Sequence, residues 1–410
     1  MVKGWKNLAL VAVALALVLA LVVTACAPRP VGVKKKEIFV GASFLFTGPA
    51  ASTGVPIAKG AIDYISHTNE TGGIEGIPVK LVWGDNASVP ARSVPILKRH
   101  LYGGAVLLLE HFSTPAELIA SSLEKEKVPL VFEAWFTPRM ATKGVRWIFT
   151  AFPPTSSEWA MCLKWLKDNW TEPRPPRVGF ISLETAAGHD YLEGARYAAE
   201  QGWIEAVGYE LLPIAGVIDT STEWLRLVGK RADWIFVYSI GATLVALVKD
   251  AARLEIQERG IKILHTVALD EYILPIVGAD AEGCYVTRNV PPAVEPLPEF
   301  DIVRRAAKKY RGYEPHQIGA TYLFGWLEAQ VAIEGIRQAI QKVGLENLTG
   351  QAVRDTLARM KVDTGIMPPV TMSDDCPFFI PFICLYQVQQ GKMVRVSEWM
   401  EIVYLLPEFD

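Results

Sequence analysis

Polar side chains that could bind a ligand follow a short apolar segment at residues 105–109. Ser113 and Thr114 carry hydroxyl groups there, and Thr114 with Glu117 has the spacing of a helix capping box. A helix N-terminus presents unpaired backbone N–H groups, which attract anions. The pattern therefore predicts hydrogen bonding to a small anion, while simple capping of the helix is the structural alternative for both hydroxyl groups.

Three further apolar segments, at residues 128–132, 234–237 and 262–266, end in comparable positions. All three are typical of buried strands, and ligands of open α/β sheets bind beyond the carboxyl ends of strands. The candidate ligand-binding residues after these segments are Ala134, Trp135, Phe136, Tyr238 and Asp270. The aromatic pair predicts an apolar pocket wall or packing between two lobes. The acidic residue either meets a ligand or caps the helix that follows.

Motifs of common catalytic centres do not occur in the sequence. It has no GxxxxGK[ST] phosphate loop, no GxSxG nucleophile elbow and no HExxH zinc helix. The six histidines are scattered without an i, i+4 pair, and there is no CxxC. We therefore expect a protein that is not an enzyme and needs no cofactor or metal. A surface-anchored α/β hydrolase with an unrecognised triad is the alternative from a different class.

The elements that must position these residues alternate between strand and helix from residue 37 onward, which predicts α/β layers around parallel sheets. Three proline-rich interruptions divide this alternation, at residues 152–154, 288–300 and 366–377. Two lobes need three crossings if the chain passes back and forth between them. The expected first lobe is residues 37–153 and 288–367, and the expected second lobe is residues 154–287 and 368–404.

The N-terminal segment has the composition of a secretory signal. Residues 8–23 are 16 consecutive apolar positions preceded by two lysines. They lead into Val23-Thr24-Ala25-Cys26, which resembles the lipobox of bacterial lipoproteins. The sequence thus predicts a signal peptide over residues 1–25, lipidation at Cys26 and a tether over residues 26–36. The body would lie outside the cytoplasm on a bacterial membrane; an uncleaved N-terminal anchor is the alternative.

Charge and cysteine content narrow the partners and the compartment. The 41 basic residues against 44 acidic ones give a net charge of −3, which argues against a nucleic-acid partner. If Cys26 carries lipid, four cysteines remain, and these are either paired in two disulfides or buried as free thiols. They are Cys162, Cys284, Cys376 and Cys384.

A specific combination of residues lies between positions 41 and 85. It contains Gly48-Pro49, Asn69-Glu70, Gly72-Gly73-Ile74 and Asp85. This combination resembles the opening of the leucine/isoleucine/valine-binding protein family, the extracytoplasmic solute receptors of ABC importers. Looser matches keep the same register to about residue 398.

The resemblance implies the type I periplasmic-binding fold, with two doubly wound parallel-sheet lobes, three hinge crossings and a ligand cleft between the lobes. It also implies that Ser113 and backbone amides hold a ligand carboxylate and that an acidic residue near Asp270 meets a ligand ammonium group. The sequence departs from the family pattern at Trp135 and Phe136, where small and hydroxyl residues are common. It departs again at Ala187, where the family has an aromatic residue.

The function that we expect from these observations is capture of an amino acid or similar small carboxylate by hinge closure, followed by delivery to the permease of an ABC importer. Hydrophobic or aromatic carboxylates, or amides, are the alternative ligands. A sensor domain of the same fold that reports to a kinase is a further alternative.

Overall fold

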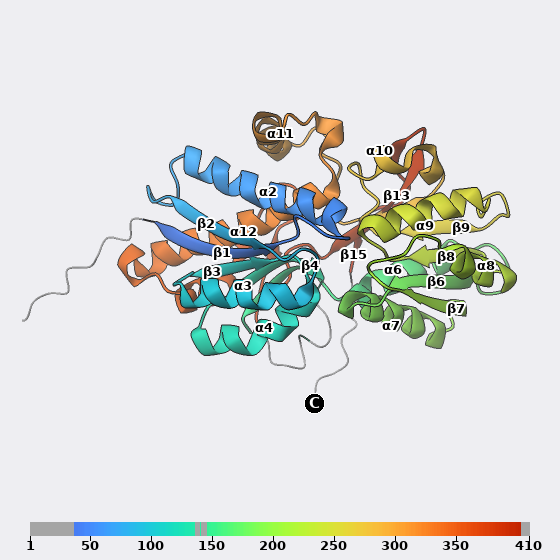
Figure 1. Ribbon diagram of the computed structural model, residues 1–410, viewed down its shortest axis with the longest axis horizontal. Coiled ribbons are helices and arrows are strands. Elements are labelled where there is room, and N and C mark those ends of the chain that lie inside the picture. Colours follow the sequence, from blue (N-terminus) through green and yellow to red (C-terminus); the bar gives the residue numbers. More distant parts are fainter. Residues whose placement is uncertain (1–36, 136–139, 141–145, 403–410) are drawn as a thin grey trace, which may run out of the picture. The chain divides into compact units, whose positions relative to one another are not determined.

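The protein was analysed as a computed structural model, which describes residues 37–135, 140 and 146–402 (Figure 1). The predicted signal peptide, lipidation site and tether lie outside the described residues, and so does Phe136. No helix within the described ranges is both long enough and apolar enough to cross a membrane.

The first sheet is parallel and has the strand order β2-β1-β3-β4-β5. Its strands are β1 (Ile38–Phe44), β2 (Val79–Asp85), β3 (Leu107–Glu110), β4 (Leu130–Trp135) and β5 (Ile148–Phe152). β4 is longer than expected, because it includes Ala134 and Trp135, which the sequence placed in a loop. Its pairing with β5 shifts register between Phe132 and Trp135.

Helices cover both faces of the first sheet because its strands alternate apolar residues between two clusters. Leu107, Leu109 and Val131 pack in one cluster with α2 (Ala51–Glu70) and α12 (Ala320–Val343). Leu108 and Leu130 pack in another with α3 (Pro90–Tyr102) and α4 (Ser113–Glu126). The sheet is therefore doubly wound, as expected.

The second sheet begins with the same strand order. Its order is β7-β6-β8-β9-β10, followed by β13 and β14. These strands are β6 (Arg177–Leu183), β7 (Glu205–Leu212), β8 (Trp234–Val237), β9 (Lys262–His265), β10 (Tyr285–Arg288), β13 (Phe382–Gln389) and β14 (Lys392–Arg395). The first five are parallel, whereas β13 is antiparallel to β10, and β15 (Met400–Glu401) and β14 are antiparallel to β13. β13 and β14 are consecutive in the chain and form a C-terminal hairpin.

The remaining helices follow the division into two sheets. Around the second sheet lie α6 (Thr155–Asp168), α7 (Ala186–Glu200), α8 (Ser221–Gly229), α9 (Gly241–Arg253) and α10 (Leu274–Val277). Packed with the first sheet are α11 (Pro298–Arg311) and α13 (Gly350–Leu357). The chain thus leaves the first sheet after β5, returns after β10 and leaves again before β13.

Two details refine the sequence interpretation. Helix α2 begins at Ala51 and contains Pro56, since a proline this early leaves a single helical hydrogen bond unmade without ending the helix. The four described cysteines are free thiols, three of them buried, which matches the second of the two alternatives for these residues.

Candidate functional site

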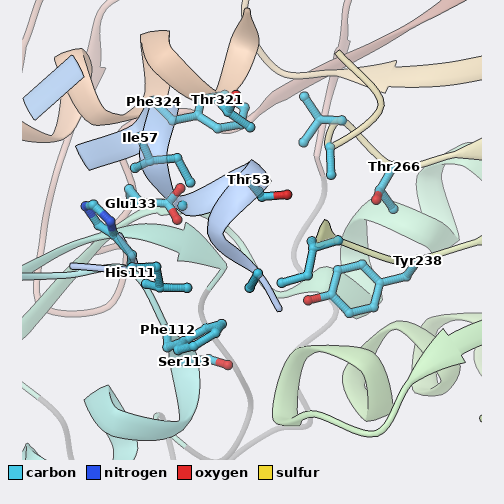
Figure 2. A pocket seen from close by; sticks show the side chains of 16 residues that line it. Thr53, Ile57, His111, Phe112, Ser113, Glu133, Tyr238, Thr266, Thr321 and Phe324 are labelled. Atoms are coloured by element: carbon cyan, nitrogen blue, oxygen red, sulfur yellow. The ribbon is translucent and has the colours of Figure 1, made fainter. Parts of the chain in front are cut away.

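A pocket of about 70 Å³ lies where the carboxyl ends of strands from both sheets meet the N-termini of α2, α4 and α12 (Figure 2). In a sheet of order 2-1-3-4-5, ligands bind at the point where the order reverses, between the first and third strands. Leu45 follows β1 and Ser113 follows β3, at the reversal of the first sheet. Tyr238 follows β8, at the equivalent reversal of the second sheet. The pocket therefore lies where the topology of both sheets predicts a ligand site.

Ser113 lines this pocket, and Thr114 does not. Helix α4 begins at Ser113 with Phe112 at the N-cap position, so Thr114 lies inside the first turn and is not the capping residue that its spacing indicated. We still expect a ligand to face the N-terminus of α4, where the Ser113 hydroxyl and the backbone N–H groups of this turn can bind it.

Tyr238 is brought into the pocket as expected. Its ring packs against Tyr191 with centroids 4.6 Å apart, and its residue is buried. Burial raises the pKa of Tyr238 to about 12, so the phenol is a neutral hydrogen-bonding group at physiological pH. Ser239, beside it, has a buried hydroxyl oxygen without a hydrogen-bond partner among the described residues.

Asp270 does not line the pocket, and its carboxylate is already engaged. Oδ2 accepts hydrogen bonds from the backbone N–H of Thr321 at 3.0 Å and from its hydroxyl at 2.5 Å. Oδ1 accepts from the backbone N–H of Tyr272 at 2.9 Å. Asp270 is not the N-cap of the helix that follows, because Ile273 holds that position in α10. Its carboxylate instead joins the loop after β9 to the start of α12. Thr321, which Asp270 orients, lines the pocket itself.

The aromatic segment after β4 gives a mixed outcome. Ala134 and Trp135 belong to β4, and Trp135 pairs with Phe152 across the sheet. Phe136 lies outside the described residues, so its predicted role as a pocket wall stays a prediction.

Ionisable residues that the sequence interpretation did not single out stand in and beside the pocket. Glu110, Glu133 and Glu328 form a group that we call the acid cluster, and His111 lies among them. Burial raises the pKa of Glu110 and of Glu133 to about 8 each, with Glu110 adding to the effect on Glu133. The signal that could have found Glu110 and Glu133 is their position directly after an apolar strand. Glu328 has no such signal, because α12 brings it to the cluster from almost 200 residues later in the chain.

His111 is held as a neutral ring. Its Nε2 lies 3.2 Å from Oε2 of Glu328, and its ring stacks on Phe44 with centroids 4.6 Å apart. Burial lowers the pKa of His111 to about 3 and raises the pKa of Glu328 well above its usual range. The pair is thus a hydrogen bond between a neutral imidazole and a neutral carboxylic acid, because neither charge is solvated there.

Helix α2 brings its first turn to the pocket and touches the start of α9. Thr53 lines the pocket and accepts a hydrogen bond from the backbone N–H of Gly241 at 3.1 Å. The carbonyl of Pro49 accepts one from Ala242 at 3.1 Å. In the described part of the chain, no group of three or more potential ligands is arranged to hold a metal ion.

Comparisons with known proteins agree with this fold. Residues 37–392 match the family model described as periplasmic binding protein. The Leu/Ile/Val/Thr-binding protein of Salmonella typhimurium is 23% identical over 256 residues, which are 62% of this chain and 67% of that protein.

Two solved structures share the fold at low sequence identity. One is a branched-chain amino acid ABC transporter protein from Thermus thermophilus with bound valine. It is 17% identical with a TM-score of 0.80, over 90% of this chain and 97% of that one. The other is a solute-binding protein of an ABC transporter from Rhodopseudomonas palustris in complex with 3,4-dihydroxybenzoic acid. It is 18% identical with a TM-score of 0.77, over 90% and 98%. Because the family model spans most of the chain, the protein belongs to the periplasmic binding protein family.

Proposed function

We propose that this chain is the solute-binding component of an ABC importer and that it captures a small molecule in the pocket of Figure 2. The observation that carries the proposal is that the pocket is lined from the reversal points of both sheets, by Ser113 on one side and Tyr238 on the other. A ligand held by both sheets stabilises the arrangement in which both sets of contacts are made. No covalent step is part of this function.

In hinge closure, two lobes built on the two sheets would rotate relative to each other around the three crossings. For these lobes we propose the ranges expected from the sequence, residues 37–153 with 288–367 and residues 154–287 with 368–404, with one change. Residues 377–380 run beside β5, where Ile380 donates a backbone hydrogen bond to Ala151, and Phe379 packs in the first-sheet cluster. The third crossing therefore belongs at about residue 381 rather than 367.

The ligand classes that we carry forward are an amino acid or similar small carboxylate, and alternatively a hydrophobic or aromatic carboxylate or amide. The relatives with bound valine and bound dihydroxybenzoate provide examples of the first and second class. Apolar pocket residues suit either one, and they include Leu45, Ile57, Val267 and Phe324.

Delivery to the importer would take place at the membrane surface. We propose that residues 1–25 are a signal peptide and that Cys26 carries the lipid anchor, with the permease as the protein partner. Intact mass of the protein purified from bacterial membranes tests this, because lipidation at Cys26 removes residues 1–25 and adds acyl mass. A mature chain that retains residues 1–25 would contradict the proposal.

Gly241 offers a test of closure. A Cβ on Gly241 would lie 2.2 Å from the carbonyl oxygen of Pro49, so Gly241→Ala would obstruct the contact between α9 and the segment before α2. We expect at least a tenfold loss of affinity for any solute that the wild type binds in a calorimetric panel of amino acids and aromatic carboxylates.

Gly278 is the matched control for this substitution. Its φ of +59° is close to the +63° of Gly241, but a Cβ there meets nothing within 4 Å. Gly278→Ala thus also places a Cβ at a positive φ but without the obstruction, and it should bind solute like the wild type. Equal affinities for the two variants would argue against closure at this contact.

A further inference from the structure

The described lining of the pocket contains one carboxyl group, that of Glu133, and no lysine or arginine side chain. Its described lining residues include three ionisable side chains, those of His111, Glu133 and Tyr238, and none of them is Lys or Arg. His111 and Tyr238 are neutral at physiological pH. Among the described lining residues, a ligand therefore meets one carboxyl group and no side-chain cation.

Glu133 differs from the other two members of the acid cluster. Glu110 accepts backbone hydrogen bonds from His111 and Phe112 at 3.0 and 3.1 Å, and Glu328 contacts His111. The side chain of Glu133 makes no hydrogen bond or ion pair with any described residue, although only 4% of the residue is exposed. Figure 2 shows its carboxyl group turned toward the pocket.

A buried polar group without a partner is costly, because it has lost water and gained nothing in return. Fully buried polar atoms without a hydrogen-bond partner among the described residues lie beside Glu133: Nδ1 of His111, Oε2 of Glu110 and Oε1 of Glu328. The first-sheet side of the pocket thus offers hydrogen-bonding capacity that the described protein residues leave unused, at a position that a ligand can reach.

We propose that the pocket selects a small, mostly apolar solute that carries a protonated amine, and that the Glu133 carboxylate is the counter-ion of this amine. This inference rests on the proposed function, and it names the substrate class of the same pocket. The apolar residues around Glu133, among them Ile57 and Phe324, would cover the rest of the solute. Asp270 cannot take this role while both its oxygens bind the chain itself.

The charge balance separates this ligand class from its rivals. Ionised Glu133 can balance the charge of an amine, whereas the described lining offers no Lys or Arg to balance a carboxylate that lacks an amine. An amino acid satisfies the requirement if its ammonium group faces Glu133 and its carboxylate faces the N-terminus of α4.

Binding of the amine should release a proton. The titratable groups that face Glu133 are Glu110 from β3, His111, Glu328 from α12 and Tyr238 after β8. Burial and Glu110 raise the pKa of Glu133 to about 8, so the empty pocket holds a neutral acid at pH 7. An amine requires the ionised form, and its affinity therefore increases from pH 6.5 to 8.5.

The test is calorimetric titration of the full chain in detergent with three probes that share a branched apolar group: isobutylamine, L-valine and isovalerate. We expect the two probes with an amine to bind and isovalerate not to bind, with amine affinity at least tenfold higher at pH 8.5 than at pH 6.5. Glu133→Gln should lower amine affinity at least tenfold at pH 8.5. Glu110→Gln removes a neighbouring carboxyl outside the lining and should change it less than threefold.

Each other outcome counts against the proposal. If isovalerate or benzoate binds the wild type at least as tightly as the amines, the inference fails while the receptor function stands. If no probe binds, the inference fails as well, and the receptor function is then judged by the Gly241 and Gly278 variants on the wider panel. If Glu133→Gln does not fold, the wild type is titrated in two buffers of different ionisation enthalpy. About one proton released per amine supports the inference, and none overturns it.

Discussion

Asp270 and Glu133 are both buried carboxyls near the pocket, and of the two the sequence indicated only Asp270 as a ligand candidate. Asp270 follows a strand and precedes a short helix, and its oxygens accept three close hydrogen bonds from the chain. Glu133 lies within β4, makes no side-chain contact with a described polar group, and faces the pocket. The two carboxyls therefore differ in whether the described residues already use their hydrogen-bonding capacity.

Asp270→Asn tests the structural role. The amide NH₂ of asparagine would face N–H or O–H donors at one of the two oxygen positions, so a hydrogen bond would be lost there. We therefore expect a loss of about 2 kcal/mol in the free energy of unfolding, measured by guanidinium denaturation. Asp168→Asn, on an exposed residue paired with Lys164, should cost less than about 0.5 kcal/mol. Unchanged stability together with a large loss of solute affinity would restore Asp270 to the ligand site.

At the scale of elements, the contact between α2 and α12 sets the shape of the pocket. Each helix contributes two or more lining residues, with Thr53 and Ile57 on α2 and Thr321 and Phe324 on α12. The helices approach so closely that a Cβ on Gly325 would lie 1.8 Å from the carbonyl oxygen of Ile57. Two backbones can come this near only where one residue has no side chain.

Gly325→Ala should therefore destabilise the protein by about 3 kcal/mol, because neither backbone can move without shifting a helix. The measurement is the free energy of unfolding, with Gly229→Ala in α8 as the control. Gly229 is also helical, and a Cβ there meets nothing within 4 Å, so this change should be neutral or stabilise by up to about 1 kcal/mol. Equal effects of the two substitutions would contradict the close packing.

The whole molecule carries a pH dependence that follows from its buried ionisable groups. Between pH 6.5 and 8, folded Glu110 and Glu133 hold protons, because their pKa values are raised to about 8, while an unfolded glutamate is ionised. The folded state then binds more protons than the unfolded state, so stability falls as pH rises. His111 and His265, with pKa values lowered to about 3, act with the opposite sign and only below about pH 6.5.

We therefore expect the free energy of unfolding without ligand to fall by about 1 kcal/mol or more per pH unit from pH 6.5 to 8. Glu133→Gln should reduce this slope by about a third, since Glu110 and Glu328 also hold protons in the folded state and one of three carboxyls is gone. Denaturation curves across this range provide the measurement. If the free energy of unfolding rises with pH, or if Glu133→Gln leaves the slope unchanged, these carboxyls are ionised in the folded state.

The sequence by itself indicated the α/β class and the three interruptions, because strand periodicity and turn residues are local signals. Its resemblance to a known family implied the doubly wound sheets. The sequence also indicated Ser113 and Tyr238, since ligands gather after strand ends in any such sheet. Only the tertiary structure decided that Thr53 reaches the pocket, because α2 begins five residues before Pro56. It alone brought Glu328 of α12 to Glu133 and engaged Asp270 with Thr321, since burial and pairing depend on residues that are distant in the chain.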